Sequence, residues 1–152
     1  MTQTSDQPEI TTKYPGEGHA ALRHGRVSMT GQIYHVSTTT IGRSRLFDDF
    51  ATGCAAARCF ESRAVLGDAH MLAWVLMPDH VHWLIGLGEQ YFLDVLVSRL
   101  KAASARNVNR ASNRNGAAWA RAYHDHALRS DEDVASVARY IVANPLRAGL
   151  VK

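Results

Sequence analysis

This chain of 152 residues has few cysteines and no long apolar run. The first argues against a disulfide-rich or zinc-binding protein, and the second against a membrane-spanning one. The two cysteines, Cys54 and Cys59, are five residues apart. Because this spacing matches neither a redox CxxC motif nor a usual zinc pair, we expect buried or free thiols in a reducing compartment. No apolar run approaches the about 20 residues of a membrane span, and residues 1–12 lack the apolar core of a signal peptide. The expectation is a cytoplasmic protein with one domain.

Acidic residues are also scarce in one region, residues 98–130, where Asp125 is the single acid. The net charge of the whole chain is only +3, so this block concentrates positive charge. Such a block inside a folded domain favours a polyanionic partner, usually nucleic acid. Charge alone supports equally well a solvated helix face followed by a loop. The candidate contacts in this block are Arg99, Lys101, Arg106, Arg110 and Arg114.

The chain before the first expected strand divides into two parts. Residues 1–15 are expected to be disordered, and residues 16–152 to form a single domain. Within that domain, residues 16–31 are basic and punctuated by glycine. They predict either an N-terminal arm that carries Arg23 and Arg26 to a phosphate or a plain lead-in to the domain.

The pattern of apolar residues predicts an α+β fold. Runs rich in β-branched and aromatic residues predict strands at residues 33–40, 69–76, 80–87 and 119–128. Helical spacing predicts helices at residues 48–66 and 92–109, a polar loop at 107–116, and a last helix from Ser130 that Pro145 ends. The buried stripe of this last helix is expected at Val134, Val137, Ala138, Ile141 and Val142. This order is the βαββαβ order of a ferredoxin-like antiparallel sheet with an appended C-terminal helix.

Two histidines, His80 and His82, open the third predicted strand. Successive side chains of a strand point to opposite faces, so both imidazoles share one face, with Cα atoms about 7 Å apart. Val81 and Trp83 take the other face. A strand that buries one face and sets two imidazoles on the other predicts a metal site, or else a polar pair satisfied by hydrogen bonds. His124 and His126 form a rival pair of the same spacing, which is better explained as a structural or DNA-facing strand.

The last helix adds a phenol and an amide. Tyr140 and Asn144 are four residues apart, so they are neighbours on one helix face. If this helix packs near the histidine pair, the amide oxygen of Asn144 is a plausible third metal ligand and the phenol of Tyr140 a plausible nucleophile. A phenol with a pKa of about 10 needs a nearby cation or base. A metal held by two imidazoles can polarise a phosphodiester, and attack by the phenol would conserve the bond as a phosphotyrosine.

These motifs resemble those of a known family. His80-Val81-His82 resembles the His–hydrophobic–His signature of the HUH endonucleases, and residues 139–151, RYIVANPLRAGLV, resemble the tyrosine helix of single-tyrosine, IS200-like transposases. From about Gly18 to Val151 the chain resembles the REP-associated branch of that family, whose name refers to repetitive extragenic palindromes. The matching segments are GQIYHV at 31–36, WVLMPDHVHW at 74–83 and YHDHALR at 123–129.

The resemblance implies a metal-dependent enzyme that nicks single-stranded DNA beside a hairpin and transfers the strand. Tyr140 would be joined to the 5′ phosphate, leaving a free 3′ hydroxyl. Mg²⁺ or Mn²⁺ would be held by His80, His82 and Asn144, where some relatives carry glutamine. The partners would be REP-like palindromic hairpins. The resemblance implies a monomer, with a dimer as the alternative, in the bacterial cytoplasm at the nucleoid. The main alternative is a catalytically inactive, domesticated regulator that binds hairpin DNA or RNA; a phosphodiesterase that uses water is the weaker one.

Overall fold

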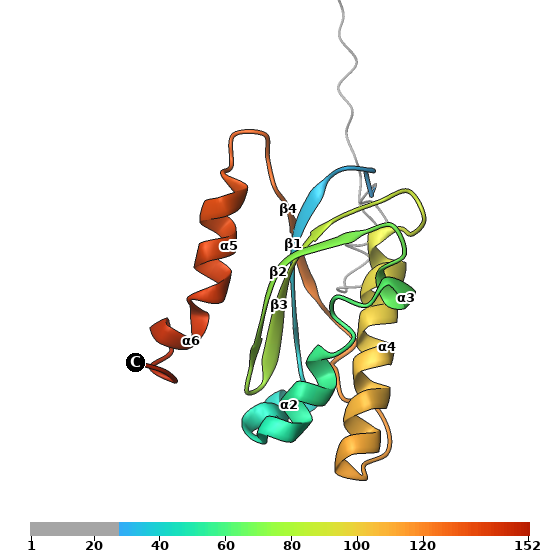
Figure 1. Ribbon diagram of the computed structural model, residues 1–152, viewed down its shortest axis with the longest axis vertical. Coiled ribbons are helices and arrows are strands. Elements are labelled where there is room, and N and C mark those ends of the chain that lie inside the picture. Colours follow the sequence, from blue (N-terminus) through green and yellow to red (C-terminus); the bar gives the residue numbers. More distant parts are fainter. Residues whose placement is uncertain (1–27) are drawn as a thin grey trace, which may run out of the picture.

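The computed structural model describes residues 28–152 and is built on one four-stranded sheet (Figure 1). The strands lie in the order β2-β3-β1-β4, and every neighbouring pair is antiparallel. This order confirms the predicted ferredoxin-like sheet. Residues 1–27, with the predicted disordered segment and with Arg23 and Arg26 of the arm, lie outside the described residues. The strands are β1 (Ile33–Thr39), β2 (His70–Met77), β3 (His80–Gly86) and β4 (His124–Ala127).

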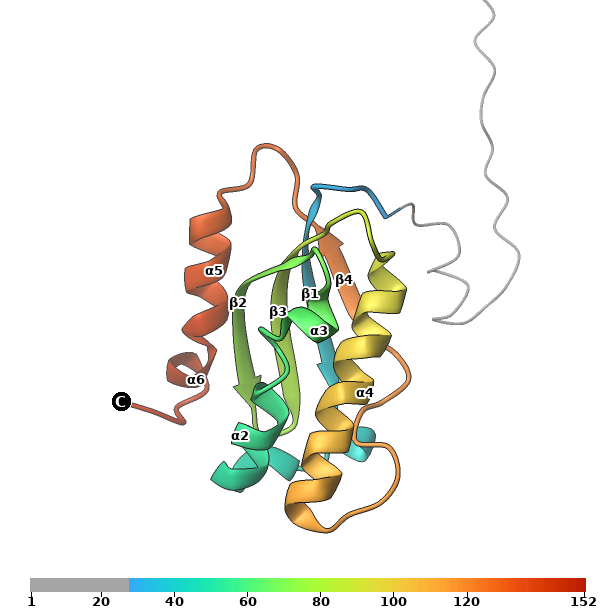
Figure 2. The ribbon, with the colours of Figure 1, turned by 45° about the vertical axis from the view of Figure 1, so that its right-hand side comes forward.

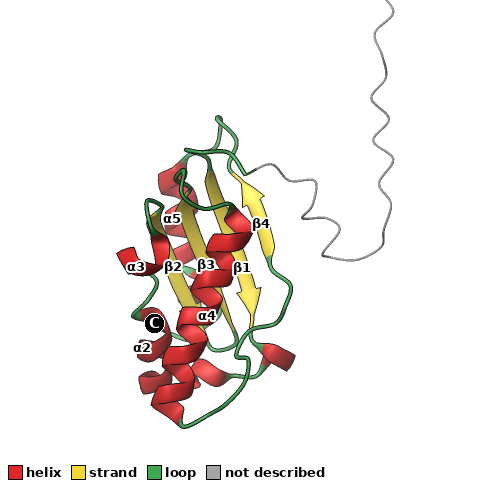
Figure 3. Cartoon of the chain, turned by 90° about the vertical axis from the view of Figure 1, so that its right-hand side faces the viewer, coloured by secondary structure: helices red, strands yellow, loops and turns green. Residues whose placement is uncertain are grey.

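Helices cover both faces of the sheet, one group on each side (Figure 2). One face carries α2 (Phe50–Ala57), α3 (Arg63–Leu66) and α4 (Leu93–Ser112), with the 3₁₀ turns η1 (Ile41–Arg43) and η2 (Leu46–Asp48) between β1 and α2. The appended elements α5 (Val134–Val142) and α6 (Asn144–Arg147) lie on the other side, where α5 packs against β2 and β3. The long helix α4 runs across the front of the sheet in Figure 3. No helix in the described part of the chain is long and apolar enough to cross a membrane.

The alternation of β3 separates the two faces, as the sequence predicts. Val81 and Trp83 are fully buried in the larger apolar cluster, under α2 and α4. Trp83 meets the ring of Phe60 edge-on, with the centroids 5.3 Å apart. Leu84 belongs to the smaller cluster on the α5 side. His80 and His82, in register with Leu84, therefore lie on the α5 side.

The helix predicted at residues 48–66 is two helices. Asp49 caps α2, because its Oδ2 accepts the Thr52 N–H at 2.9 Å. The helix then gives way to a turn in which the Ser62 N–H donates to the Cys59 carbonyl. This turn buries Phe60 completely, and α3 follows it. The prediction of one helix was wrong because burial of Phe60 outweighs the helical preference of the alanine-rich segment.

The helix predicted at residues 92–109 extends further, to Ser112. Asn113 ends it in a left-handed conformation, with φ at 51°. Asparagine is one of the few residues that adopt this conformation readily, which makes it a suitable end for a helix. The predicted polar loop therefore begins several residues later than expected.

The fourth strand is shorter than predicted. Only residues 124–127 pair with β1, and Trp119 makes an isolated bridge with Thr40. The amino group of Lys101 donates to the carbonyl oxygens of Ala120, Arg121 and Ala122. Because a lysine side chain takes these carbonyls, the segment before β4 runs beside α4 instead of continuing the sheet ladder.

The last helix begins and ends at other residues than predicted. Asp133, not Ser130, is its N-cap, and its carboxylate accepts the N–H groups of Ala135 and Ser136. The helix ends at Val142, and Pro145 lies in the first turn of α6. A proline has no N–H to donate to the Ile141 carbonyl four residues earlier, and the Asn144 side chain donates there instead, at 3.1 Å. Val142, predicted to be buried, is 53% exposed.

Candidate active site

The two predicted metal-binding histidines lie side by side on β3. The ring centroids of His80 and His82 are 5.0 Å apart, and the ring planes are at 83° to each other. Both residues are partly buried, on the strand that lies between β1 and β2. The structure thus brings the pair together on the α5 side.

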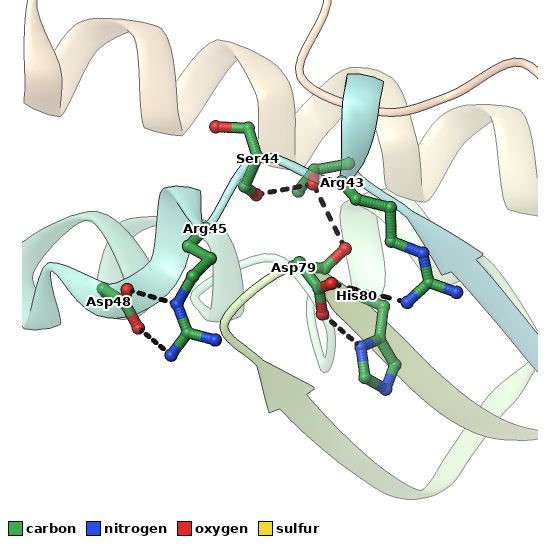
Figure 4. Close-up of polar contacts among 7 residues, drawn as sticks. Arg43, Ser44, Arg45, Asp48, Asp79 and His80 are labelled. Carbon is green, nitrogen blue, oxygen red and sulfur yellow. Dashed lines mark hydrogen bonds and ion pairs between the residues drawn. The ribbon is translucent and has the colours of Figure 1, made fainter.

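His80 is held by a carboxylate from the turn that precedes β3. Its Nδ1 lies 2.6 Å from Oδ1 of Asp79 (Figure 4). Asp79 in turn accepts a hydrogen bond from Arg43 at 3.4 Å. The hydrogen bond from His80 and the Arg43 charge lower the pKa of Asp79, so this group is a carboxylate. With Nδ1 committed to Asp79, the Nε2 atom of His80 is left to bind a ligand.

His82 is held by another histidine, from β1. Its Nδ1 lies 3.0 Å from Nε2 of His35, and the two ring centroids are 5.2 Å apart. Burial, together with the charges of His35, His80 and Arg147, lowers the pKa of His82 to about 4. Burial and the charge of His126 also lower the pKa of His35. Both rings are therefore neutral at physiological pH, which is the form that a metal ligand requires.

The rival pair, His124 and His126, lies on β4, which pairs with the other edge of β1. His126 pairs with His35 across the β1–β4 ladder, and its Nε2 lies 2.9 Å from a carboxylate oxygen of Glu132. Glu132 also accepts the Arg129 N–H, so it closes the loop between β4 and α5. In residues 28–152, no group of three or more His, Cys, Asp or Glu side chains is arranged to hold a metal ion.

The helix that carries Tyr140 is docked beside the histidine pair by its neighbour, Ile141. Ile141 is fully buried in the smaller apolar cluster with Val75 and Met77. These two residues of β2 are the direct cross-strand partners of His82 and His80. The end of α5 is therefore anchored next to the pair, while the side chain of Tyr140 is 60% exposed.

The sequence predicts Tyr140 and Asn144 on one continuous helix. This prediction was wrong, because the helix breaks at Ala143. Asn144 is partly buried and begins α6. Its amide nitrogen donates to the Ile141 carbonyl, so its Oδ1 remains as the oxygen for a ligand. Arg147, three residues further, returns to Tyr140. Its Nη2 donates to the Tyr140 carbonyl at 2.6 Å, and its guanidinium carbon lies 3.8 Å from the centre of the phenol ring.

The predicted DNA-contacting residues of α4 lie on the opposite side of the sheet from the histidines. Arg99 donates to the carbonyls of Ala64 and Val65 and lies over the Tyr91 ring, so it ties α3 to α4. Lys101 binds the three carbonyls before β4. The structure does not place either side chain at the histidine pair. The charge of Arg106 opposes the rise in the pKa of Cys59 that burial causes. Arg110 lines a pocket of about 360 Å³ with Arg58 and Asn107. The Arg114 N–H donates to the Asn109 carbonyl in the turn after α4.

Four residues of this site are additional to those that sequence reasoning selected: His35, Arg43, Asp79 and Arg147. Asp79 could have been found, because a carboxylate directly before a histidine often orients its ring. His35 and Arg43 depend on strand pairing and on a loop conformation, for which the sequence carries no local signal. Arg147 depends on the helix break at Ala143.

Two solved structures are similar to this chain in fold. One match is a REP-associated tyrosine transposase bound to a REP hairpin, with a TM-score of 0.60 and 22% identity, covering 83% of this chain and 73% of that one. Another is a protein from Deinococcus radiodurans R1 described as a transposase, with a TM-score of 0.55 and 26% identity, covering 78% of this chain and 94% of that one. The first likeness, at this identity, concerns the fold alone.

Sequence comparison connects the same region to one family. A protein of Haemophilus influenzae described as a REP-associated tyrosine transposase is 31% identical in an alignment 91 residues long, which covers 53% of this chain and 52% of that protein. The aligned region thus spans about half the length of this curated relative. The family model described as "Transposase IS200 like" matches residues 28–144, which include the four strands, the histidine pair, Tyr140 and Asn144. The chain therefore belongs to the IS200-like transposase family.

Proposed function

We propose that this protein nicks single-stranded DNA beside a palindromic hairpin and transfers the strand through a 5′-phosphotyrosine on Tyr140. One observation carries the proposal. Two imidazoles, each held at Nδ1 by a separate partner, lie beside the helix end that presents the exposed phenol. Membership of the IS200-like family supports the same class of reaction.

The histidine pair fits a divalent cation. His80 has a carboxylate behind it and His82 has His35, which are the outer partners that orient metal-bound imidazoles. The Nε2 atoms of both rings and Oδ1 of Asn144 would hold the ion, which we propose is Mn²⁺ or Mg²⁺. Nitrogen ligands favour manganese of the two. When bound, the ion would polarise the phosphodiester and stabilise the charge that develops on it.

The chemical step exchanges one phosphodiester for another. Oη of Tyr140 attacks the phosphorus and loses its proton to solvent, the P–O3′ bond breaks, and the 3′ oxygen takes up a proton as it leaves. The products are a 5′-phosphotyrosine and a 3′ hydroxyl. Because no bond energy is lost to hydrolysis, attack by a 3′ hydroxyl on the phosphotyrosine reverses the reaction and joins two strands. The exposed position of the phenol leaves room for a DNA strand to reach it.

The hairpin would be held mainly through its phosphates, which position a nucleic acid without reading its sequence. Arg23 and Arg26, Arg106, Arg110 and Arg114 are proposed for this role. Arg58 and Arg110 both line the pocket between α2 and α4, which is a proposed place for one of these phosphates. Arg99 and Lys101, also proposed, would have to exchange hydrogen bonds with backbone carbonyls for bonds to DNA.

A nicking assay with labelled hairpin strands tests the proposal. Wild-type protein with Mn²⁺ should give a covalent protein–DNA band on a denaturing gel. Tyr140→Phe should abolish that band and keep hairpin binding, because the substitution removes only the hydroxyl. Tyr91→Phe is the matched control, since Tyr91 lies on the α4 side of the sheet under Arg99.

Each outcome decides between the candidate functions. An adduct that persists in Tyr140→Phe would reject Tyr140 as the nucleophile. Nicking without any adduct would point to a phosphodiesterase that uses water. Hairpin binding without nicking, in Mn²⁺ and in Mg²⁺, would point to a regulator that binds hairpins.

A further inference from the structure

Arg147, from α6, lies against Tyr140 at the end of α5. Its guanidinium carbon lies 3.8 Å from the centre of the Tyr140 ring, at stacking distance, and its Nη2 donates to the backbone carbonyl of the same residue at 2.6 Å. Its positive charge also contributes to the lowered pKa of His82. One side chain thus contacts Tyr140 twice, at its ring and at its backbone.

The break at Ala143 makes this contact possible. On a continuous helix, residues seven apart are separated by about 10 Å along the axis, and side chains lean toward the N-terminus, so the Tyr140 ring would lean away from Arg147. Pro145 interrupts the helix, and the short α6 turns Arg147 back toward α5. The same proline therefore ends the helix of the nucleophile and places a cation on its ring.

An exposed phenol needs such a restraint. With 60% of its surface exposed, the Tyr140 side chain is held by few neighbours and has several rotamers open to it. A planar guanidinium that stacks on the ring and also bonds the backbone fixes the ring relative to the helix. Displacement of a reacting group by about 1 Å can cost about 100-fold in rate.

We propose that Arg147 is a positioning residue that stacks on the Tyr140 ring and holds its hydroxyl toward the phosphate bound at the histidine pair. The role in nicking rests on the proposed function, whereas the contact between Arg147 and Tyr140 does not depend on it. Arg147→Ala should lower kcat for nicking by about 10- to 100-fold and leave hairpin affinity within about twofold. Arg147→Lys should recover little, because an ammonium group cannot stack as a plane.

Guanidinium rescue and a matched variant separate positioning from a general structural role. Millimolar guanidinium should restore part of the nicking rate of Arg147→Ala and none of the rate of Tyr140→Phe. Arg139→Ala is the control, because Arg139 is an exposed arginine of α5, directly before Tyr140. Its rate should stay within about twofold of wild type. The midpoint of thermal unfolding of Arg147→Ala should match that of the control.

A measurement without DNA or metal decides the proposal independently of activity. In protein labelled with 3-fluorotyrosine, the ¹⁹F signal of residue 140, assigned by its loss in Tyr140→Phe, should shift in Arg147→Ala and stay in place in Arg139→Ala. An unmoved signal, or an unchanged kcat with a weaker hairpin affinity, would overturn the inference. If wild-type protein never nicks DNA, the proposed function fails, and the fluorine signal still decides whether Arg147 holds the ring.

Discussion

Replacing His82 with glutamine is expected to make the fold less sensitive to acid. Burial lowers the pKa of this imidazole from 6.5 to about 4, with smaller effects from the charges of His35, His80 and Arg147. The folded protein thus binds the proton less tightly than the unfolded chain. Stability is therefore complete above pH 6.5 and falls as the pH approaches 4, because only the unfolded chain takes up the proton in that window.

The size of the effect follows from the two pKa values. The difference between 6.5 and about 4, at about 1.4 kcal/mol for each pKa unit, gives about 3.4 kcal/mol. Since the ring is only partly buried, solvent screening reduces this to about 1.7 kcal/mol. Wild-type protein should lose about this much more free energy of unfolding than His82→Gln between about pH 7 and about pH 4.

Urea unfolding with a chelator present, at both pH values, measures the difference. His70→Gln is the matched control, because His70 is an exposed histidine of the neighbouring strand. Its free energy of unfolding should follow that of wild type. Equal losses in wild type and His82→Gln would refute the reasoning, and would mean that His82 is not held neutral by its surroundings.

The other predictions concern the site, its anchor, its ligand and the thiols. His35→Ala should weaken Mn²⁺ binding, measured by calorimetry, by about 10-fold or more, and an unchanged affinity would show that His35 does not orient His82. Ile141→Ala should lower the free energy of unfolding by about 2–4 kcal/mol in urea titrations, and a loss below about 1 kcal/mol would contradict the anchoring of α5. Hairpin affinity should fall steeply as salt rises, and a flat response would argue against binding through phosphates. Cys54 should react with a thiol reagent well before Cys59, whose burial raises its pKa to about 11; equal rates would place Cys59 at the surface.

Element type was predictable from this sequence because the apolar pattern changes sharply between period 2 and helical spacing. The alternation around His80-Val81-His82 correctly assigned the faces of β3, since Val81 is fully buried and both histidines lie opposite. The ends of elements were less predictable. They depend on contacts between distant residues, such as Lys101 with the carbonyls before β4 and Asn144 with the Ile141 carbonyl.

The partners of the site were the least predictable part. His80 and His82 are visible in the sequence because they share a strand. His35, which orients His82, is 47 residues away and is adjacent only through the antiparallel register of β1 and β3. The contact of Arg147 with Tyr140 was not predictable for another reason. It depends on the helix break at Ala143, since on a continuous helix Arg147 would lie about two turns from Tyr140. Local spacing thus predicts ligands on one element, whereas their supporting contacts require the fold.

The most direct test of the account is to identify the residue that is joined to DNA. The protein is incubated with Mn²⁺ and a hairpin strand and then digested with nuclease and trypsin. A nucleotide should remain on the peptide of residues 140–147, which begins after Arg139, ends with Arg147 and contains one tyrosine. Mass spectrometry of that peptide should place a phosphotyrosyl nucleotide at Tyr140. Nicked DNA with the peptide unmodified, or a nucleotide on Tyr123 or Tyr91 instead, would contradict the account.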